Sequence, residues 1–337
     1  MKKIWLLGCL GLLLACDQLS EQPDDPYKFL MPAHFPAPTY RFENNPITQK
    51  GFELGKKLFN DPILSRDGSI ACSNCHSKSV AFADPQHRLS VGIDDLIGLR
   101  NAPPLANLAF MKAYFWDGGV THLDFVPINA IESEFEMGEL LSTVVQKLNV
   151  HSQYPTLFQA AFPEMNSITS PMLLHSLSQY MNLLVSANAK YDQYIRKEVT
   201  LSAIELEGLK LFEQKCASCH SGALFTNQAY KNNGLDTIFT DAGRALISEG
   251  EDDLGKFRVP SLRNIALTAP YMHDGRFATL EEVLDHYSSG VKNSPTLAVE
   301  LRSTGKLGIA LSEEEKVELI HFLQVLTDHE FVANELF

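Results

Sequence analysis

The chain has 337 residues, 45% of them hydrophobic, and a formal net charge of −13 at pH 7. This is enough sequence for two domains of ordinary size. The chain has no basic tract, which excludes nucleic acid as an expected partner, and an acidic surface instead favours a basic protein partner through electrostatic steering.

The N-terminal residues have the features of a bacterial export signal. Two lysines precede an apolar run, Ile4–Ala15, that has the length of a signal peptide and is too short to span a bilayer. The run ends in Leu13-Leu14-Ala15-Cys16, which resembles a lipobox. We therefore expect residues 1–15 to be a lipoprotein signal peptide, with lipid anchoring through Cys16 on the periplasmic side of the cell envelope. An ordinary secretory signal is the alternative. Residues 16–44 would form a tether and an N-terminal extension.

Helical signals dominate the rest of the chain, and strand signals are short and few. Apolar periodicity and capping residues predict helices that start near Thr48, at Ser202 and at Ser312, and that span Gly138–Leu148 and Pro171–Leu184. Glu205 and Glu315 complete capping boxes at the second and third of these starts. We expect an all-α fold.

Two C-x-x-C-H motifs, Cys72-Ser73-Asn74-Cys75-His76 and Cys216-Ala217-Ser218-Cys219-His220, carry four of the six cysteines. This pattern attaches a c-type haem, because the two thiols add to the porphyrin vinyl groups and the adjacent histidine binds the iron. A single zinc site would need its ligand pairs close together, and these lie far apart in the sequence. The motifs therefore predict two covalently bound haems c.

The two motifs belong to a repeated pattern. Gly55-Lys56-Lys57-Leu58-Phe59 precedes the first motif and Gly208-Leu209-Lys210-Leu211-Phe212 precedes the second. The first copy carries an additional loop, Asp61–Ile70, before its cysteines. We predict two cytochrome c-like domains related by duplication, residues 45–199 and 200–337, each holding one haem.

The residues alone leave the second axial ligand of each haem open. A haem with two strong ligands transfers electrons, whereas a haem with an open face can activate a small molecule. The candidates for the first haem are His87, Met111, His122 and Met137, and those for the second are Met272, His273, His286 and Tyr287.

Several longer stretches resemble the bacterial di-haem cytochrome c peroxidases and the MauG-like branch of that superfamily. They run in family order from about Asn45 to Thr327: Arg100-Asn101-Ala102-Pro103, Phe115-Trp116-Asp117-Gly118, Glu136-Met137-Gly138, Val259-Pro260-Ser261-Leu262-Arg263-Asn264 and Leu267-Thr268-Ala269-Pro270-Tyr271-Met272-His273-Asp274-Gly275.

The resemblance implies roles for individual residues. His76 would be the proximal ligand of a peroxidatic N-terminal haem, and His220 that of a C-terminal electron-transfer haem. Trp116 would lie between the haems and relay electrons. Glu136 would be the distal acid of the peroxidatic site, unless it belongs to a solvated acidic loop with its neighbours. Arg263 would contact a haem propionate, with a surface salt bridge as the alternative.

The resemblance also implies a calcium ion at the domain interface. Asn101, Thr268 and Pro270 match the positions that hold it, two of them through backbone carbonyls. Oxygen ligands of this kind suit a hard cation.

The sequence departs from the peroxidase pattern at three positions. Many peroxidases have a histidine where Ser90-Val91-Gly92 is followed by Ile93, and isoleucine cannot bind iron. The first haem is therefore expected to be open unless His87 substitutes. Tyr287 stands where the peroxidases place an axial methionine of the second haem, as in the MauG-like branch. Val126 replaces a glutamine, which removes one distal polar group.

Three functions follow from the resemblance. The first is reduction of hydrogen peroxide at the N-terminal haem, with electrons delivered through the C-terminal haem by a small redox protein such as a cytochrome c or a cupredoxin. The second is MauG-like oxidation of a partner protein through a bis-Fe(IV) state. The third is a non-catalytic di-haem electron carrier or redox sensor. Relatives are often dimers, so a homodimer is one option.

Overall fold

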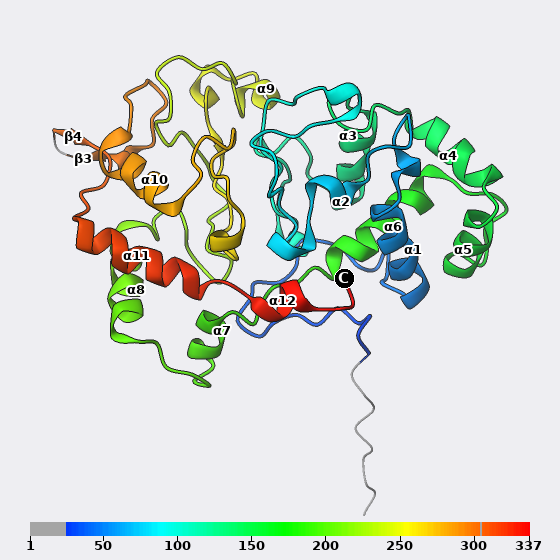
Figure 1. Cartoon of the computed structure of the whole chain (residues 1–337), viewed down its shortest axis with the longest axis horizontal. Helices are drawn as coiled ribbons and strands as arrows, with labels where there is room; N and C mark the ends of the chain where they lie inside the picture. Colours follow the sequence, from blue (N-terminus) through cyan, green and yellow to red (C-terminus); the bar gives the residue numbers. More distant parts are fainter. Residues whose placement is uncertain (1–24, 304) are drawn as a thin grey trace, which may run out of the picture.

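The computed structural model describes residues 25–303 and 305–337, so the predicted signal peptide and Cys16 lie outside the described residues. The chain is mostly helical, as predicted, and forms two lobes that lie side by side in Figure 1. The helices are α1 (Gln49–Phe59), α2 (Cys72–Cys75), α3 (Val126–Glu132), α4 (Leu141–Val150), α5 (Tyr154–Ala161), α6 (Ser170–Asn182), α7 (Lys190–Ile195), α8 (Ala203–Lys215), α9 (Ala245–Ser248), α10 (Leu280–Asp285), α11 (Glu313–Val325) and α12 (His329–Ala333).

The expectation of an all-α fold needs one correction, because four short strands are present. They are β1 (Tyr230–Lys231), β2 (Phe257–Arg258), β3 (Arg302–Ser303) and β4 (Lys306–Leu307). They form two antiparallel pairs, β1 with β2 and β3 with β4. None of the helices in the described chain combines the length and the apolar character needed to cross a membrane.

The capping signals in the sequence located the helix starts well. The Thr48 side chain caps α1 and accepts from the Gly51 amide. Ser202 and Ser312 form the predicted capping boxes at the starts of α8 and α11. In each box the serine hydroxyl and a glutamate three residues on satisfy backbone amides that a helix leaves unpaired.

The helix predicted over Gly138–Leu148 begins three residues later, as α4. Gly138 has a φ of +59°, and a Cβ built there would lie 2.2 Å from Cδ1 of Ile93. The chain therefore turns at Gly138 instead of starting a helix, and this turn holds Glu136 beside Ile93, whose amide donates to the Glu136 carbonyl at 2.8 Å. The helix predicted over Pro171–Leu184 is α6.

Each lobe is built on one pair of closely packed helices, α1 with α6 and α8 with α11. The glycine of each G-x-x-L-F repeat lies at the closest approach. A Cβ on Gly55 would lie 2.0 Å from the Ser176 carbonyl oxygen, and one on Gly208 would lie 2.0 Å from the Glu318 carbonyl oxygen. The repeated glycines thus allow the same helix contact in both lobes.

Replacing either of these two glycines with alanine is expected to destabilise the protein. The added methyl group meets helix backbone, which cannot move aside, so Gly55→Ala and Gly208→Ala should each lower the free energy of unfolding by about 1–3 kcal/mol. Chemical denaturation of the haem-loaded protein measures the change. Gly250→Ala is the matched control, since its Cβ would meet nothing closer than Ser248 Oγ at 3.5 Å. An equal loss in the control would contradict the packing explanation.

Two main groups of buried apolar side chains form the cores. The first core spans residues from Phe35 to Leu184 and also includes Phe331 of α12. The second core joins α8, α10 and α11, and Tyr191 of α7 packs against it. The domain boundary near residue 199 stays a prediction, although α7 already contacts the second core before that point.

The chain after α12 returns to the first lobe. Phe337 packs against the first core, with its ring 6.4 Å from that of Phe82. Lys78 Nζ donates to the Asn334 carbonyl at 2.6 Å, and Lys56 Nζ donates to the Leu336 carbonyl at 2.8 Å. Residues of the C-terminal segment therefore complete the first lobe.

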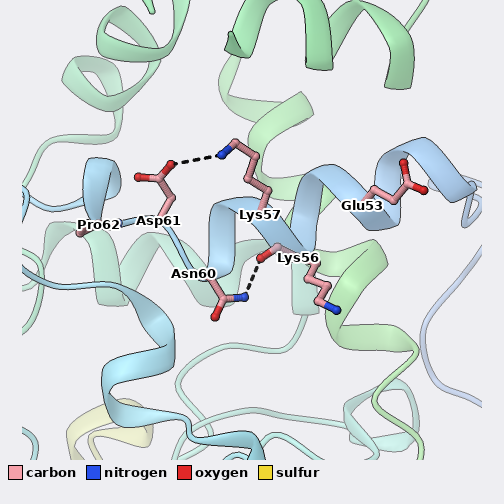
Figure 2. Close-up of a pocket in the computed structure, with 6 residues that line it drawn as sticks. All are labelled: Glu53, Lys56, Lys57, Asn60, Asp61 and Pro62. Carbon is pink, nitrogen blue, oxygen red and sulfur yellow. Dashed lines mark hydrogen bonds and ion pairs between the residues drawn. The ribbon is translucent and has the colours of Figure 1, made fainter. Parts of the chain in front are cut away.

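A shallow surface hollow lies at the C-terminal end of α1 (Figure 2). Lys57 Nζ pairs there with Asp61 at 3.9 Å, and Asn60 Nδ2 donates to the Lys56 carbonyl at 2.8 Å. The hollow is lined by Glu53, Lys56, Lys57, Asn60, Asp61 and Pro62, and none of them is a predicted site residue.

Candidate functional site

The first C-x-x-C-H motif forms one tight turn. Cys72–Cys75 make up α2, and the His76 amide donates to the Cys72 carbonyl at 3.0 Å. His76 Nδ1 donates to the Phe82 carbonyl at 2.9 Å. A histidine that is held through one ring nitrogen presents the other, here Nε2, to a metal.

The second motif repeats this geometry. The His220 amide donates to the Cys216 carbonyl at 3.0 Å, and His220 Nδ1 donates to the Phe225 carbonyl at 3.2 Å. Burial lowers the pKa of His220 to about 4, so its ring is neutral near pH 7. A neutral imidazole is the form that ligates iron.

The two carbonyls that hold the histidines come from residues with unusual backbone conformations. Phe82 has a φ of +62° and Phe225 a φ of +52°. Bulky residues rarely occupy this left-handed region, and when they do it is often at a functional site. In each lobe, a phenylalanine in this left-handed conformation therefore directs its carbonyl at the motif histidine.

The four motif cysteines are free thiols and are partly buried. Burial raises the pKa of Cys72 to about 12, that of Cys75 to about 11 and that of Cys216 to about 12. A redox-active C-x-x-C pair has a lowered cysteine pKa instead. The raised pKa values therefore do not suit disulfide exchange.

Glu136 lies near the first motif. Its charge acts on both Cys72 and Cys75, which places the carboxylate close to the two thiols. Burial raises the pKa of Glu136 to about 7. The neighbouring Glu132 and Glu134 are exposed, so the three residues do not form one solvated acidic loop.

The residues near Glu136 include no histidine in the position used by many peroxidases. Ile93 stands there and is buried. His87 is partly exposed and its Nδ1 lies 3.1 Å from the buried Asp84 carboxylate. Val126 starts α3 and packs against the first core.

The other ligand candidates for the first haem differ in their environments. Met111 and Met137 are buried in the first core. His122 Nδ1 accepts from the Asp124 amide at 3.3 Å and its ring is half-exposed.

A large and mostly apolar cavity opens at the second motif. It is lined by residues of both lobes, among them the predicted site residues Asn101, Trp116, Cys216, Cys219, His220, Thr268, Pro270 and Tyr287. Met272 and His273 also line it, whereas His286 does not and instead lies 3.0 Å from the Asn233 carbonyl through Nε2. Four ligand candidates are thereby reduced to three.

Tyr287 is positioned by an irregular stretch of helix. Directly after α10 the chain forms one turn of π-helix, His286–Gly290, a feature that often occurs at functional sites. Burial raises the pKa of Tyr287 to about 12, the nearby Asn233 side chain opposes this shift, and the charges of Cys219 and Cys216 add to it. The phenol therefore lies close to both thiols of the second motif.

Trp116 lies where the two lobes meet. Its Nε1 donates to the Asn101 carbonyl at 2.8 Å, and its own carbonyl accepts from the Arg258 amide at 2.7 Å. In a matching contact, the Asn101 amide donates to the His273 carbonyl at 2.7 Å. These hydrogen bonds hold Trp116 at the wall of the cavity that opens at the second motif. We call this space the second cavity.

The predicted calcium residues share this region. Asn101, Thr268 and Pro270 line the same cavity. Asn101 Nδ2 donates to the Arg88 carbonyl at 3.1 Å, while within the described chain its Oδ1 accepts no hydrogen bond. A free amide oxygen suits a calcium ligand. Calcium binding itself stays a prediction.

The expected role of Arg263 needs correction. Arg263 is buried, does not line the cavity, and binds Asp192 through both terminal nitrogens at 2.8 Å. Its Nε donates to the Ala223 carbonyl at 2.7 Å. His34 Nε2 binds the same Asp192 carboxylate at 2.8 Å. The guanidinium thus serves a buried ion pair, and neither a haem contact nor a surface salt bridge describes it.

Comparison with known proteins agrees with these features. Residues 49–200 match the family model described as di-haem cytochrome c peroxidase. The chain is 34% identical to the methylamine utilization protein MauG of Methylorubrum extorquens, over 94% of this chain and 89% of that protein. The chain belongs to the di-haem cytochrome c peroxidase family. Its members include peroxide-using di-haem oxidoreductases, and their cofactors are two haems c.

Both cytochrome c peroxidases and MauG-like proteins are similar to this chain. The cytochrome c551 peroxidase of Pseudomonas aeruginosa is 30% identical, over 96% of this chain and 90% of that protein. The crystal structure of a MauG-like protein associated with microbial copper homeostasis aligns with a TM-score of 0.83 and 32% identity, covering 92% of this chain and 98% of that one.

The sequence pattern missed some residues of this family site. Asn233 beside Tyr287 carried no signal, because its role depends on a contact that only the fold makes. Phe82 and Phe225 act through their carbonyls, so side-chain type did not reveal them. A phenylalanine follows each motif histidine at a similar distance, six residues after His76 and five after His220, and this was the available signal.

Proposed function

We propose that the protein is a di-haem peroxidase that reduces hydrogen peroxide at the first motif and receives electrons through the second. The observation that supports this most is Glu136, a carboxyl group beside Cys72 and Cys75 with a pKa raised to about 7 and with Ile93 as its neighbour. The first site would therefore have a proton-transfer group and no blocking histidine.

The chain's residues fit two haems. Cys72 and Cys75 would attach the first and Cys216 and Cys219 the second, while His76 and His220 offer Nε2 to iron because Nδ1 is held by a carbonyl. Haem, when bound, supplies the iron chemistry of peroxide reduction. We further propose that the two lobes arose by duplication and that each holds one of these groups.

Glu136 would move the proton that peroxide cleavage requires. As a carboxylate it takes the proton from one peroxide oxygen, and as the acid it delivers that proton to the other oxygen, which leaves as water. The whole reaction consumes one peroxide, two protons and two electrons and releases two waters. A pKa near neutrality makes both directions of transfer accessible near pH 7.

Trp116 would connect the two sites. It is held at the lobe junction by Asn101 and Arg258 and lines the second cavity. The electrons would come from a small redox protein such as a cytochrome c or a cupredoxin, and the net charge of −13 would attract a donor that has a basic surface.

The test is a measurement of haem content and peroxide turnover together. The purified protein should contain two haems by the pyridine haemochrome assay, and it should oxidise a reduced cytochrome c or cupredoxin when peroxide is added. Two low-spin, six-coordinate haems whose ferric spectrum ignores peroxide would instead identify an electron carrier or redox sensor.

A second function, MauG-like oxidation of a partner protein, is favoured by Tyr287. This phenol lies beside the thiols of the second motif, where a peroxidase would have methionine. A tyrosinate ligand is a hard anionic donor that lowers the haem potential and favours oxidised iron. The chain would then transfer oxidising equivalents to a protein substrate and would need no small donor.

The variant Tyr287→Met tests whether Tyr287 is the axial ligand of the second haem, as the second function requires. A thioether in place of a tyrosinate should raise the potential of the second haem by on the order of 100 mV or more and change its EPR spectrum. Spectroelectrochemical titration measures the potential. Tyr271→Phe is the control, because Tyr271 lines the same cavity but its hydroxyl donates to the Ile265 carbonyl. An unchanged second haem in the methionine variant would show that Tyr287 is not its ligand.

Three further proposals concern the setting of the protein. We propose export to the periplasmic side of the cell envelope with a lipid anchor at Cys16, on the basis of the lipobox-like sequence. Calcium at Asn101, Thr268 and Pro270 is proposed from their shared position in the second cavity. A homodimer is proposed from the family alone.

A further inference from the structure

Arg258 lies at the junction of the two lobes and lines the second cavity. It belongs to β2, where it pairs with Tyr230 of β1. Its amide donates to the Trp116 carbonyl at 2.7 Å, so the backbones of Arg258 and Trp116 are held together. Its side chain contributes to the cavity wall together with Trp116 and Tyr287.

The Arg258 guanidinium has no anionic partner in the described chain. Its Nε donates to the Phe115 carbonyl at 3.3 Å, and one terminal nitrogen contacts Met111 Sδ at 3.9 Å. Burial lowers the pKa of Arg258, and the only groups that oppose this are the phenols of Tyr230 and Tyr114. A guanidinium does not deprotonate in proteins, so its charge has no counter-charge among the described residues.

The other cationic side chains of the cavity wall differ from Arg258 in this respect. Lys215 Nζ lies 2.6 Å from Glu315, and Lys231 Nζ lies 2.6 Å from Glu300. Burial lowers the pKa of His273, which favours its neutral form. Among the described residues of the wall, Arg258 is therefore the one cation without a carboxylate partner.

A missing anion would complete this arrangement. The planar guanidinium matches a carboxylate in a two-point contact better than an ammonium does. A c-type haem carries two propionate carboxylates, and the cavity that Arg258 lines is the one onto which His220 and Cys219 open. No described carboxylate competes for the position.

We propose that Arg258 binds a propionate carboxylate of the haem held by the second motif and so ties that haem to Trp116. This rests on the proposal that the second motif carries a haem, but not on peroxide turnover. The family resemblance implied such a propionate contact for Arg263, five residues later in the chain, whose guanidinium binds Asp192.

The test is the midpoint potential of each haem as a function of pH in Arg258→Gln. Loss of a positive charge beside the haem should lower the potential of the second haem. The released propionate should also take up a proton on reduction, so the potential should fall as pH rises across the range in which carboxylic acids and histidines titrate. Wild type should show little pH dependence there. Besides the motif residues, the other ionisable groups facing this space are Tyr114, Tyr230, Tyr271, Tyr287, Lys215, Lys231, Glu300 and His273.

Arg244→Gln is the matched control. The Arg244 guanidinium stacks on Tyr230, 4.4 Å from the ring centroid, and Arg244 does not line the cavity. Its loss removes the same charge and should leave the pH profile unchanged. A wild-type potential and pH profile for both haems in Arg258→Gln would overturn the proposal, and a change confined to the first haem would overturn the assignment to the second motif.

Arg258→Lys provides a second measurement if the glutamine variant does not accumulate. Lysine keeps the charge but loses the two-point contact, so the propionate bending band in the resonance Raman spectrum should shift while the potential stays near that of wild type. An unchanged band would contradict the proposal. Protein that contains no covalent haem by the pyridine haemochrome assay would instead contradict the proposed function on which this inference rests.

Discussion

Glu136→Gln is expected to lower kcat/KM for peroxide about 100-fold or more while both haems stay attached. Glutamine has nearly the same shape as glutamate but cannot accept and return a proton, and loss of a general acid–base group costs about 100- to 10,000-fold in rate. Stopped-flow measurement of the reaction with peroxide gives the rate directly. Haem content and the resting spectrum should match those of wild type.

The pH profile separates proton transfer from a packing effect. The carboxylate form of Glu136 is the one that accepts the first proton, and burial raises its pKa to about 7. The wild-type rate should therefore rise as pH increases through about 7, and the glutamine variant should lack this rise. Glu134→Gln is the control, since Glu134 is exposed and should leave both rate and profile unchanged. A glutamine variant with most of the wild-type rate would exclude Glu136 as the proton-transfer group.

Arg263→Leu is expected to lower the free energy of unfolding by about 3–5 kcal/mol. The change leaves the Asp192 carboxylate buried with the His34 ring and the Ala189 amide as partners but without its guanidinium, and breaking a buried ion pair in this way costs several kcal/mol. Arg263 also covers the Phe35 ring, with its guanidinium 4.5 Å from the ring centroid, so packing is lost as well. Denaturant unfolding of the haem-loaded protein measures the loss.

A double variant tests the cause of this loss. Arg263→Leu combined with Asp192→Leu removes both charges, so it should be more stable than Arg263→Leu alone. Lys210→Ala is a control for charge loss at the surface, because its pair with Glu207 is exposed on both sides and should contribute less than about 0.5 kcal/mol. Additive losses in the double variant would show that the buried ion pair is not the cause.

Local signals in the sequence predicted the parts of the fold that depend on local chemistry. Serine and threonine caps located the starts of α1, α8 and α11 because a cap acts within one helical turn. The motif turns were equally predictable, since the spacing of Cys72, Cys75 and His76 is fixed by the haem they attach. Short helices such as α7 and α12 were missed, because tertiary contacts more than periodicity keep them helical.

The two arginines of the lobe junction show where sequence reasoning stops. Arg258 and Arg263 are both arginines and lie five residues apart. Arg263 binds Asp192, whereas Arg258 lines the cavity and has no carboxylate partner among the described residues. That difference depends on Asp192, which lies far away in the sequence. Glu136 drew attention in the sequence because its stretch resembled a family motif, and in the structure burial raises its pKa to about 7, while its role stays a prediction.

The position of Phe331 and Phe337 against the first core has a consequence for how the protein matures. A chain that is exported from its N-terminus onward presents Cys72 and Cys75 long before these two aromatic residues emerge. Phe82, whose carbonyl holds His76, has its ring 5.8 Å from that of Phe331 and 6.4 Å from that of Phe337, so these two residues cover one part of it. On the proposed route of export, the first motif would therefore meet the attachment machinery before the C-terminal segment packs against the first lobe.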